Sequence, residues 1–280
     1  MLLPSCQPLR AEVLDVSRQG GLREGEPDIT HKVFLDIAVA PRSFKRASER
    51  TLGDASVLPL EEAQPLGRIV LGLYGRSAPS TVANFLRLVA SGALADTTFS
   101  RVLPGEYIQA GQQGAHRLGQ VDAEAADLQP NPDMLRSAAF LPRHLRPGTL
   151  SLSLGADNDE EPGVRARQGY RPTEFLITTG PGPVPRLDNS NLVFGRVLEG
   201  MATVASIAQV PTFKPSDRSK QINMFAQSIG DDRAAGVRRK YGKPLKAVII
   251  TSAGELPLDA PQGPPLTARV SRETASAAVA

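Results

Sequence analysis

The sequence predicts a mainly β fold, an antiparallel barrel or sandwich with a few helices. Short apolar segments follow one another without the regular strand–helix alternation that builds a parallel doubly wound sheet. Glycine and proline together account for 49 of the 280 residues, about 17%, against an average of roughly 12%. This surplus indicates many turns and long loops, which a helical bundle does not need.

Two strands are predicted in the first quarter of the chain. Over residues 31–39 every second position is apolar, as in a strand with one buried face: Val33, Leu35, Ile37 and Val39. A second apolar run over 68–74 is bounded by Gly67 and Gly75, and it predicts the second strand.

A helix should follow this second strand. Ser77 is a suitable N-cap residue, and Pro79 is tolerated in a first helical turn. Gly92 predicts the end of the helix. The apolar positions between these ends share one helical face: Val82, Phe85, Leu86 and Val89.

The rest of the chain predicts short strands and two more helices. The strands are expected at 97–102, 107–110, 149–154, 175–178, 192–195 and 247–251. Helices are expected over 201–210 and 221–241, where apolar residues recur at helical spacing.

We expect one domain over residues 31–252, preceded by an extension at 1–30 and followed by a disordered tail at 253–280. Polar, glycine-rich and proline-rich stretches predict insertions in the domain at about 40–65, 111–147, 155–172 and 211–243.

Composition excludes several classes of chemistry. The single cysteine, Cys6, cannot build a disulfide framework or a cysteine-based zinc cluster, and three scattered histidines make no metal site, so no metal or cofactor is expected. A net charge of +3 and 5% aromatic residues do not indicate a nucleic-acid partner. No apolar run reaches the roughly 18 residues that a membrane-spanning helix needs.

The most informative stretch is 98–111. Phe99 and Arg101 are expected on opposite sides of a strand, and the turn Pro104-Gly105 leads into a second strand that carries Gln109. Periodicity alone favours Arg101 as a surface charge on an edge strand.

This stretch nevertheless resembles the signature of the cyclophilins, in which Phe-His-Arg, two apolar residues, Pro-Gly and two further apolar residues precede a glutamine. Other segments resemble the same family in the same order: 66–74, 78–85, 148–153, 173–178 and 187–201. The resemblance implies a closed eight-stranded antiparallel β-barrel capped by two helices, here with an extra helical insertion.

The resemblance also implies peptidyl-prolyl cis-trans isomerase activity on Pro-containing polypeptides, without a cofactor. By correspondence Arg101 is the catalytic arginine, Gln109 binds the substrate backbone and helps to position Arg101, and Phe99 supports the arginine. The proline pocket would be lined by Tyr107, Leu176 and Leu187.

The chain departs from the family pattern at the edge of this pocket. Glu106 replaces a pocket phenylalanine, and Arg186 and Asn191 replace the groove tryptophan and histidine. Glu106 could pair with Arg101 or point to solvent. We therefore predict reduced activity and weak cyclosporin binding. A non-catalytic module that binds Pro-containing peptides or assists assembly remains the alternative, ahead of an unrelated β-barrel.

Two further expectations concern the setting of the protein. Residues 222–234 and 244–248 resemble divergent plastid cyclophilins of plants and algae, which suggests a chloroplast location, with the cytoplasm as the alternative. We expect the protein to be a monomer.

Overall fold

The computed structural model describes residues 26–42, 58–124, 126–154, 172–214, 216, 221 and 241–258. The predicted helix over 221–241 falls almost wholly outside the described residues, as do 1–25 and 259–280 of the predicted extension and tail. No helix in the described part of the chain is long and apolar enough to cross a membrane.

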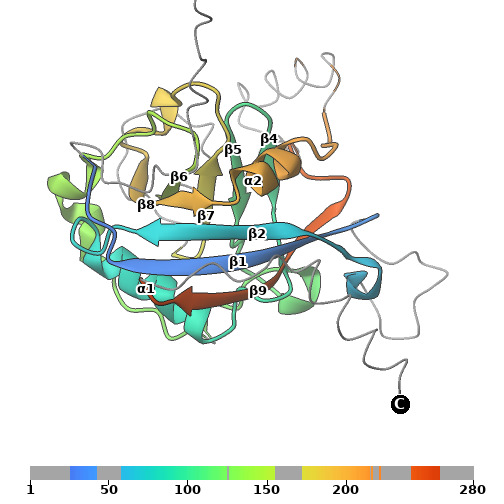
Figure 1. The fold of residues 1–280 in the computed structure, drawn as a ribbon, viewed down its shortest axis with the longest axis horizontal. Coiled ribbons are helices and arrows are strands. Elements are labelled where there is room, and N and C mark those ends of the chain that lie inside the picture. Colours follow the sequence, from blue (N-terminus) through green and yellow to red (C-terminus); the bar gives the residue numbers. More distant parts are fainter. Residues whose placement is uncertain are drawn as a thin grey trace, which may run out of the picture.

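The predicted strands and the first two predicted helices are present (Figure 1). The strands are β1 (His31–Ala40), β2 (Gln64–Leu73), β3 (Thr97–Thr98), β4 (Arg101–Leu103), β5 (Tyr107–Ala110), β6 (Thr149–Ser153), β7 (Phe175–Thr178), β8 (Asn191–Glu199) and β9 (Ala247–Leu256). The helices are α1 (Pro79–Ala90), which lies beside β9, and α2 (Met201–Ala208), which lies beside β2. β9 continues five residues beyond the Thr251 predicted as its end.

The sheet closes into a barrel. Its strand order is β3-β9-β1-β2-β8-β6-β7-β5-β4, and every pairing is antiparallel. The two end segments, β3 and β4, are separated in the chain only by Phe99 and Ser100. The Phe99 amide donates to Val248 of β9 at 2.9 Å, and the Ser100 amide donates to Gln109 of β5 at 2.9 Å. One kinked strand thus joins both ends of the sheet, which confirms the predicted eight-stranded barrel.

α1 packs on the main core of the barrel through its apolar face. The ring of Phe85 meets those of Phe175 and Phe194, each at 5.3 Å between centroids. Leu88 is buried on this face, whereas the predicted Leu86 is only partly buried. Gly92 follows the helix with φ +72°, a left-handed conformation that favours glycine, so the predicted end is confirmed.

The predicted cap of α1 is wrong. The N-cap residue is Ala78, and the Ser77 side chain does not cap the helix. Instead the carboxylate of Asp133, 52 residues away, accepts the amide of Thr81 at 2.8 Å. A carboxylate at this end also suits the helix dipole. Asn84 exchanges two hydrogen bonds with the backbone of Gln129, so the excursion over 111–147 is fastened to α1.

A partly buried ion pair joins β1 and β2. Asp36 and Arg68 face each other in register, and both nitrogens of the Arg68 fork bond the Asp36 carboxylate, at 2.6 and 2.8 Å. Ser252 of β9 donates to the same carboxylate at 2.8 Å. The pair therefore ties three neighbouring strands together.

Arg68→Ala is expected to lower the free energy of unfolding by about 2–3 kcal/mol, because it leaves the Asp36 carboxylate buried without its main donor. The matched control is Arg76→Ala, whose pair with Asp28 is largely exposed and should cost less than about 0.5 kcal/mol. Urea unfolding of both variants measures the difference, and equal losses would contradict the prediction.

Candidate active site

Two residues of the predicted catalytic segment, Arg101 and Gln109, lie in one row that crosses four strands. Arg101 on β4 pairs with Gln109 on β5, Gln109 pairs with Leu176 on β7, and Leu176 pairs with Ser151 on β6. Directly opposed residues of antiparallel strands point to the same face of a sheet. The row therefore places the guanidinium, the amide and the leucine side by side.

Alternation along the strands separates this face from the barrel core. Val102, Ile108 and Ile177 point inward and belong to the main hydrophobic core. Their strand neighbours Leu103, Tyr107 and Leu176 belong to a second, smaller apolar cluster on the other face, which Val184 and Leu187 complete from a turn. We call these five residues the outer cluster. It contains all three side chains predicted to line the proline pocket.

Arg101 is held in place by the segment that leads into β9. Its side chain is 8% exposed, and its Nε donates to the carbonyl oxygen of Tyr241 at 3.3 Å. The backbone of β4 is fixed in the same way, because the Val102 amide donates to the Gly242 carbonyl at 2.8 Å. The guanidinium therefore has a defined direction, which a stabilising contact to a substrate requires.

Gln109 is anchored by a buried carboxylate. Its Nε2 donates to Oε2 of Glu174 at 2.9 Å, and Glu174 is only 2% exposed. This contact fixes which end of the Gln109 amide faces Glu174. The amide oxygen, an acceptor, is left for another donor.

Two charged residues stand at the edge of the outer cluster. Glu106 lies in the turn between β4 and β5, and it forms an ion pair with Arg186, which lies in the short 3-10 turn Pro185–Leu187. Both side chains are about two-fifths exposed. The Arg186 guanidinium also lies over the Tyr107 ring, 5.7 Å from its centroid. Burial lowers the pKa of Arg186, and the nearby charge of Arg101 lowers it further.

Comparison with known proteins identifies the family of this chain. The family model described as "Cyclophilin type peptidyl-prolyl cis-trans isomerase/CLD" matches residues 58–227. The chain belongs to the cyclophilin family. The "Peptidyl-prolyl cis-trans isomerase CYP28, chloroplastic" of Arabidopsis thaliana is 45% identical over 84% of this chain and 85% of its own length. The "Peptidyl-prolyl cis-trans isomerase D" of Saccharomyces cerevisiae is 31% identical, over 90% and 86%. A second Arabidopsis thaliana relative, "CYP26-2, chloroplastic", is 27% identical, over 91% and 81%.

Two predicted site residues of this cyclophilin belong neither to the row nor to the outer cluster and its charged edge. Phe99 is 3% exposed and belongs to the barrel core, so it lies on the opposite side from Arg101. The kink between β3 and β4 allows this change of side. Asn191 is 2% exposed at the start of β8, and its Nδ2 donates to the Leu187 carbonyl at 3.4 Å. Its visible role is to hold the turn that carries Leu187.

Three residues at the site were not foreseen from the sequence. Val184 completes the outer cluster, and its place three residues before Leu187 was an available signal. Glu174 holds Gln109 through a side-chain contact between residues 65 positions apart in the chain. Tyr241 had no local signal at all, because it lies 140 residues from Arg101 in the chain. The predicted alternatives for Glu106, a pair with Arg101 or a solvent-facing side chain, did not include Arg186.

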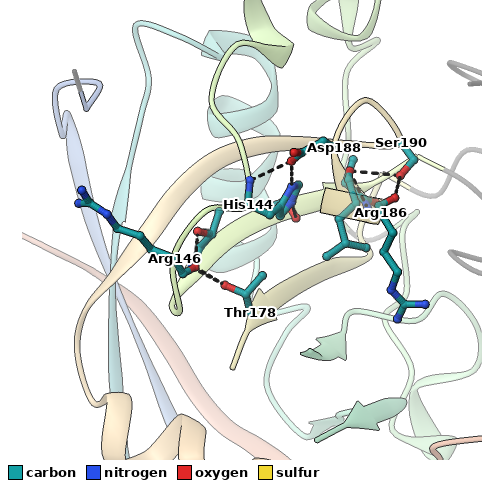
Figure 2. A network of polar contacts seen from close by, with 10 residues as sticks. His144, Arg146, Thr178, Arg186, Asp188 and Ser190 are labelled. Carbon is teal, nitrogen blue, oxygen red and sulfur yellow. Dashed lines mark hydrogen bonds and ion pairs between the residues drawn. The ribbon is translucent and has the colours of Figure 1, made fainter. Parts of the chain in front are cut away.

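A buried histidine contacts residues that adjoin the outer cluster (Figure 2). His144 is 1% exposed; its Nδ1 lies 2.8 Å from Oδ1 of Asp188, and its Nε2 lies 2.9 Å from Oγ of Ser151. A carboxylate can only accept, so Nδ1 carries the proton and Nε2 of the neutral ring accepts from Ser151. Asp188 follows Leu187 directly, and Ser151 pairs with Leu176. His144 thus links two walls of the cluster.

Because His144 is buried, we expect the stability of the protein to depend on pH. Burial lowers its pKa from the ordinary value, more than the contact with Asp188 raises it. The unfolded chain therefore takes up a proton near pH 6.5 that the folded protein resists, and the free energy of unfolding falls as the pH drops below that point. One proton contributes at most about 1.4 kcal/mol per pH unit.

Urea unfolding at pH 7.5, 6.5 and 5.5 measures this effect. His144→Gln keeps a donor and an acceptor but does not titrate, so its stability should change less over this range than that of the wild type. Parallel pH profiles of the two proteins would contradict the assignment.

Proposed function

We propose that this cyclophilin is a peptidyl-prolyl cis-trans isomerase that assists protein folding, with Arg101 as its catalytic residue. The observation that carries the proposal is the row in which Arg101, Gln109 and Leu176 face outward side by side, next to an apolar cluster. It is supported by the family match and by relatives named as such isomerases.

The reaction needs only an oriented cation and an apolar surface. The X–Pro amide rotates slowly, over a barrier of about 18–20 kcal/mol, because its C–N bond has partial double-bond character. Rotation breaks that conjugation and leaves a lone pair on the prolyl nitrogen. The Arg101 guanidinium donates to this lone pair in the twisted state and so favours it over the planar ground state.

The neighbours of Arg101 have matching roles in this proposal. The proline ring rests on Tyr107, Leu176 and Leu187, while the Gln109 amide oxygen accepts an N–H of the substrate backbone. Glu174 holds Gln109 in that orientation. Phe99 supports the kink from the core side. Glu106 and Arg186 border the path of the substrate, and Asn191 holds the turn that carries Leu187.

We further propose that turnover is slower than in family members with an aromatic pocket. Leu176 offers less apolar area than phenylalanine, a loss of about 1 kcal/mol of packing on the proline ring. The Glu106–Arg186 pair adds charge where the family has phenylalanine and tryptophan, so a substrate must remove water from that pair as it binds.

A protease-coupled assay tests the function. Chymotrypsin cleaves a proline peptide only when the X–Pro bond is trans, so added isomerase should accelerate the slow phase in proportion to its concentration. Binding of the peptide without acceleration would favour the alternative, a non-catalytic module that recognises Pro-containing segments. Neither binding nor acceleration would refute both.

The Glu106–Arg186 pair also predicts weak binding of cyclosporin. An apolar cyclic peptide would cover the half-exposed Arg186–Glu106 pair and gain no aromatic wall in return. We expect a dissociation constant weaker than about 1 μM in isothermal titration calorimetry. Arg186→Trp should tighten it, and tight binding by the wild type would show that the pair is no obstacle.

We also propose that the protein acts as a monomer in the chloroplast. The location is supported by two relatives whose names say that they are chloroplastic. An antibody against the chain should detect it in the chloroplast fraction of its source cells, and detection only in the cytosolic fraction would favour the alternative. Sedimentation of the purified protein tests the monomer.

A further inference from the structure

A second groove lies apart from the candidate active site. It has a volume of about 880 Å³ and is formed by the segment that follows β2, by β6 and β8, and by the loop over 138–147. The residues that matter below are Tyr74, Leu141, Arg143, Leu145, Arg146 and Arg196. None of the residues proposed for catalysis or proline binding lines it. Arg146 and Arg186 extend in opposite directions from the network around His144 (Figure 2).

The rim of this groove is unusually apolar for an exposed loop. Leu141 and Leu145 are 75% and 62% exposed. Proline and valine side chains continue the apolar lining between them: Pro142, Pro147, Val193 and Val197. Exposed apolar surface next to a concave site is typical of an interaction surface.

The groove carries an excess of positive charge. Three arginines line it, and Glu26 is the one carboxylate among the lining residues described. Glu26 pairs with Arg146 at 2.8 Å and with Arg196 at 3.1 Å. Arg143, between the two leucines in sequence, forms no ion pair with a described residue. The loop therefore carries a cation and two exposed apolar side chains within five residues.

The floor of the groove adds a neutral donor. Burial raises the pKa of Tyr74 to about 12, so its hydroxyl stays protonated at physiological pH. Arginines and a phenol donate hydrogen bonds, and carboxylates are the side chains that accept them best. Charge and hydrogen-bonding capacity thus select the same kind of partner.

We propose that this groove docks an acidic polypeptide segment in which carboxylates lie between leucine-like side chains. The carboxylates pair with Arg143 and its neighbours, and the apolar side chains cover Leu141 and Leu145. This surface would hold a protein partner independently of isomerisation at Arg101, so the proposal stands whether or not the chain is catalytic.

The experiment uses fluorescence anisotropy with the full chain. The probe is a labelled synthetic peptide that has a pair of aspartates between two leucines and glycine–serine ends, and that lacks proline so that it cannot enter the isomerase site as a substrate. A second peptide has lysines in place of the aspartates. We expect saturable binding of the aspartate peptide, weakened by salt, and much weaker binding of the lysine peptide.

Variants locate the site. Arg143→Glu and Leu145→Ser, both exposed substitutions, should each weaken binding about tenfold or more. The matched controls Arg117→Glu and Leu60→Ser change exposed residues outside the groove. They should leave binding of the aspartate peptide unchanged, as should Arg101→Ala.

Several results would overturn the proposal. They are the absence of saturation by the aspartate peptide, equal binding of the lysine peptide, and equal sensitivity to the control variants. Loss of binding in Arg101→Ala would place the peptide at the candidate active site instead. A dimer in sedimentation that Leu145→Ser dissociates would assign the groove to a second copy of this chain.

Discussion

Arg101→Ala is expected to lower kcat/KM for a proline peptide about 100- to 1,000-fold. The variant removes the one donor proposed to stabilise the twisted amide, and removal of a single such donor costs about 2.7–4 kcal/mol in other enzymes. Since the donor acts in the transition state, kcat should fall more than KM rises. The protease-coupled assay measures both constants.

Two controls make this result specific. Arg101→Lys keeps the positive charge but loses the planar fork of nitrogens, so it should recover only a small part of the activity. Thermal unfolding shows whether loss of the contact from Nε to Tyr241 loosens the barrel. A folded Arg101→Ala variant with wild-type kcat/KM would remove Arg101 from the mechanism.

Asp188→Ala is expected to lower the free energy of unfolding by about 2–4 kcal/mol. The Asp188 carboxylate accepts both the backbone amide of His144, at 2.9 Å, and its ring Nδ1, at 2.8 Å. Alanine leaves two buried donors unsatisfied, each of which costs about 1–3 kcal/mol. Because Asp188 adjoins Leu187 of the outer cluster, KM should rise more than kcat falls.

The matched control is Asp188→Asn, whose side-chain oxygen can still accept both hydrogen bonds. It should retain most of the stability and the wild-type KM. If the alanine and asparagine variants lose equal stability, the charge of Asp188 matters rather than its hydrogen bonds. If neither changes KM, the network does not position Leu187.

The strands were predictable because their signal is local. Val33, Leu35 and Ile37 alternate with less buried neighbours, and the structure buries all three completely. The hairpin around Pro104-Gly105 was equally predictable, and its register sets Arg101 opposite Gln109. Motif spacing therefore located the centre of the candidate site before any coordinates did.

The cap of α1 shows where local reasoning ends. Ser77 had the right chemistry and the right place in the sequence, yet Asp133 supplies the acceptor from a different loop. A capping rule assumes that the nearest polar side chain is available, but a folded chain offers others at the same distance in space. The prediction for Glu106 was incomplete for the same reason, because its partner Arg186 lies 80 residues away in the chain.

By itself, the sequence determined the elements, their order and the side chains proposed for the chemistry, since alternation, turn residues and motif spacing act over a few residues. Only the tertiary structure decided how those side chains are held: Arg101 by Tyr241, Gln109 by Glu174, and Leu187 and Leu176 by the contacts of His144. These contacts join distant parts of the chain, and their partners come together only in the folded structure, a geometry that no local pattern encodes.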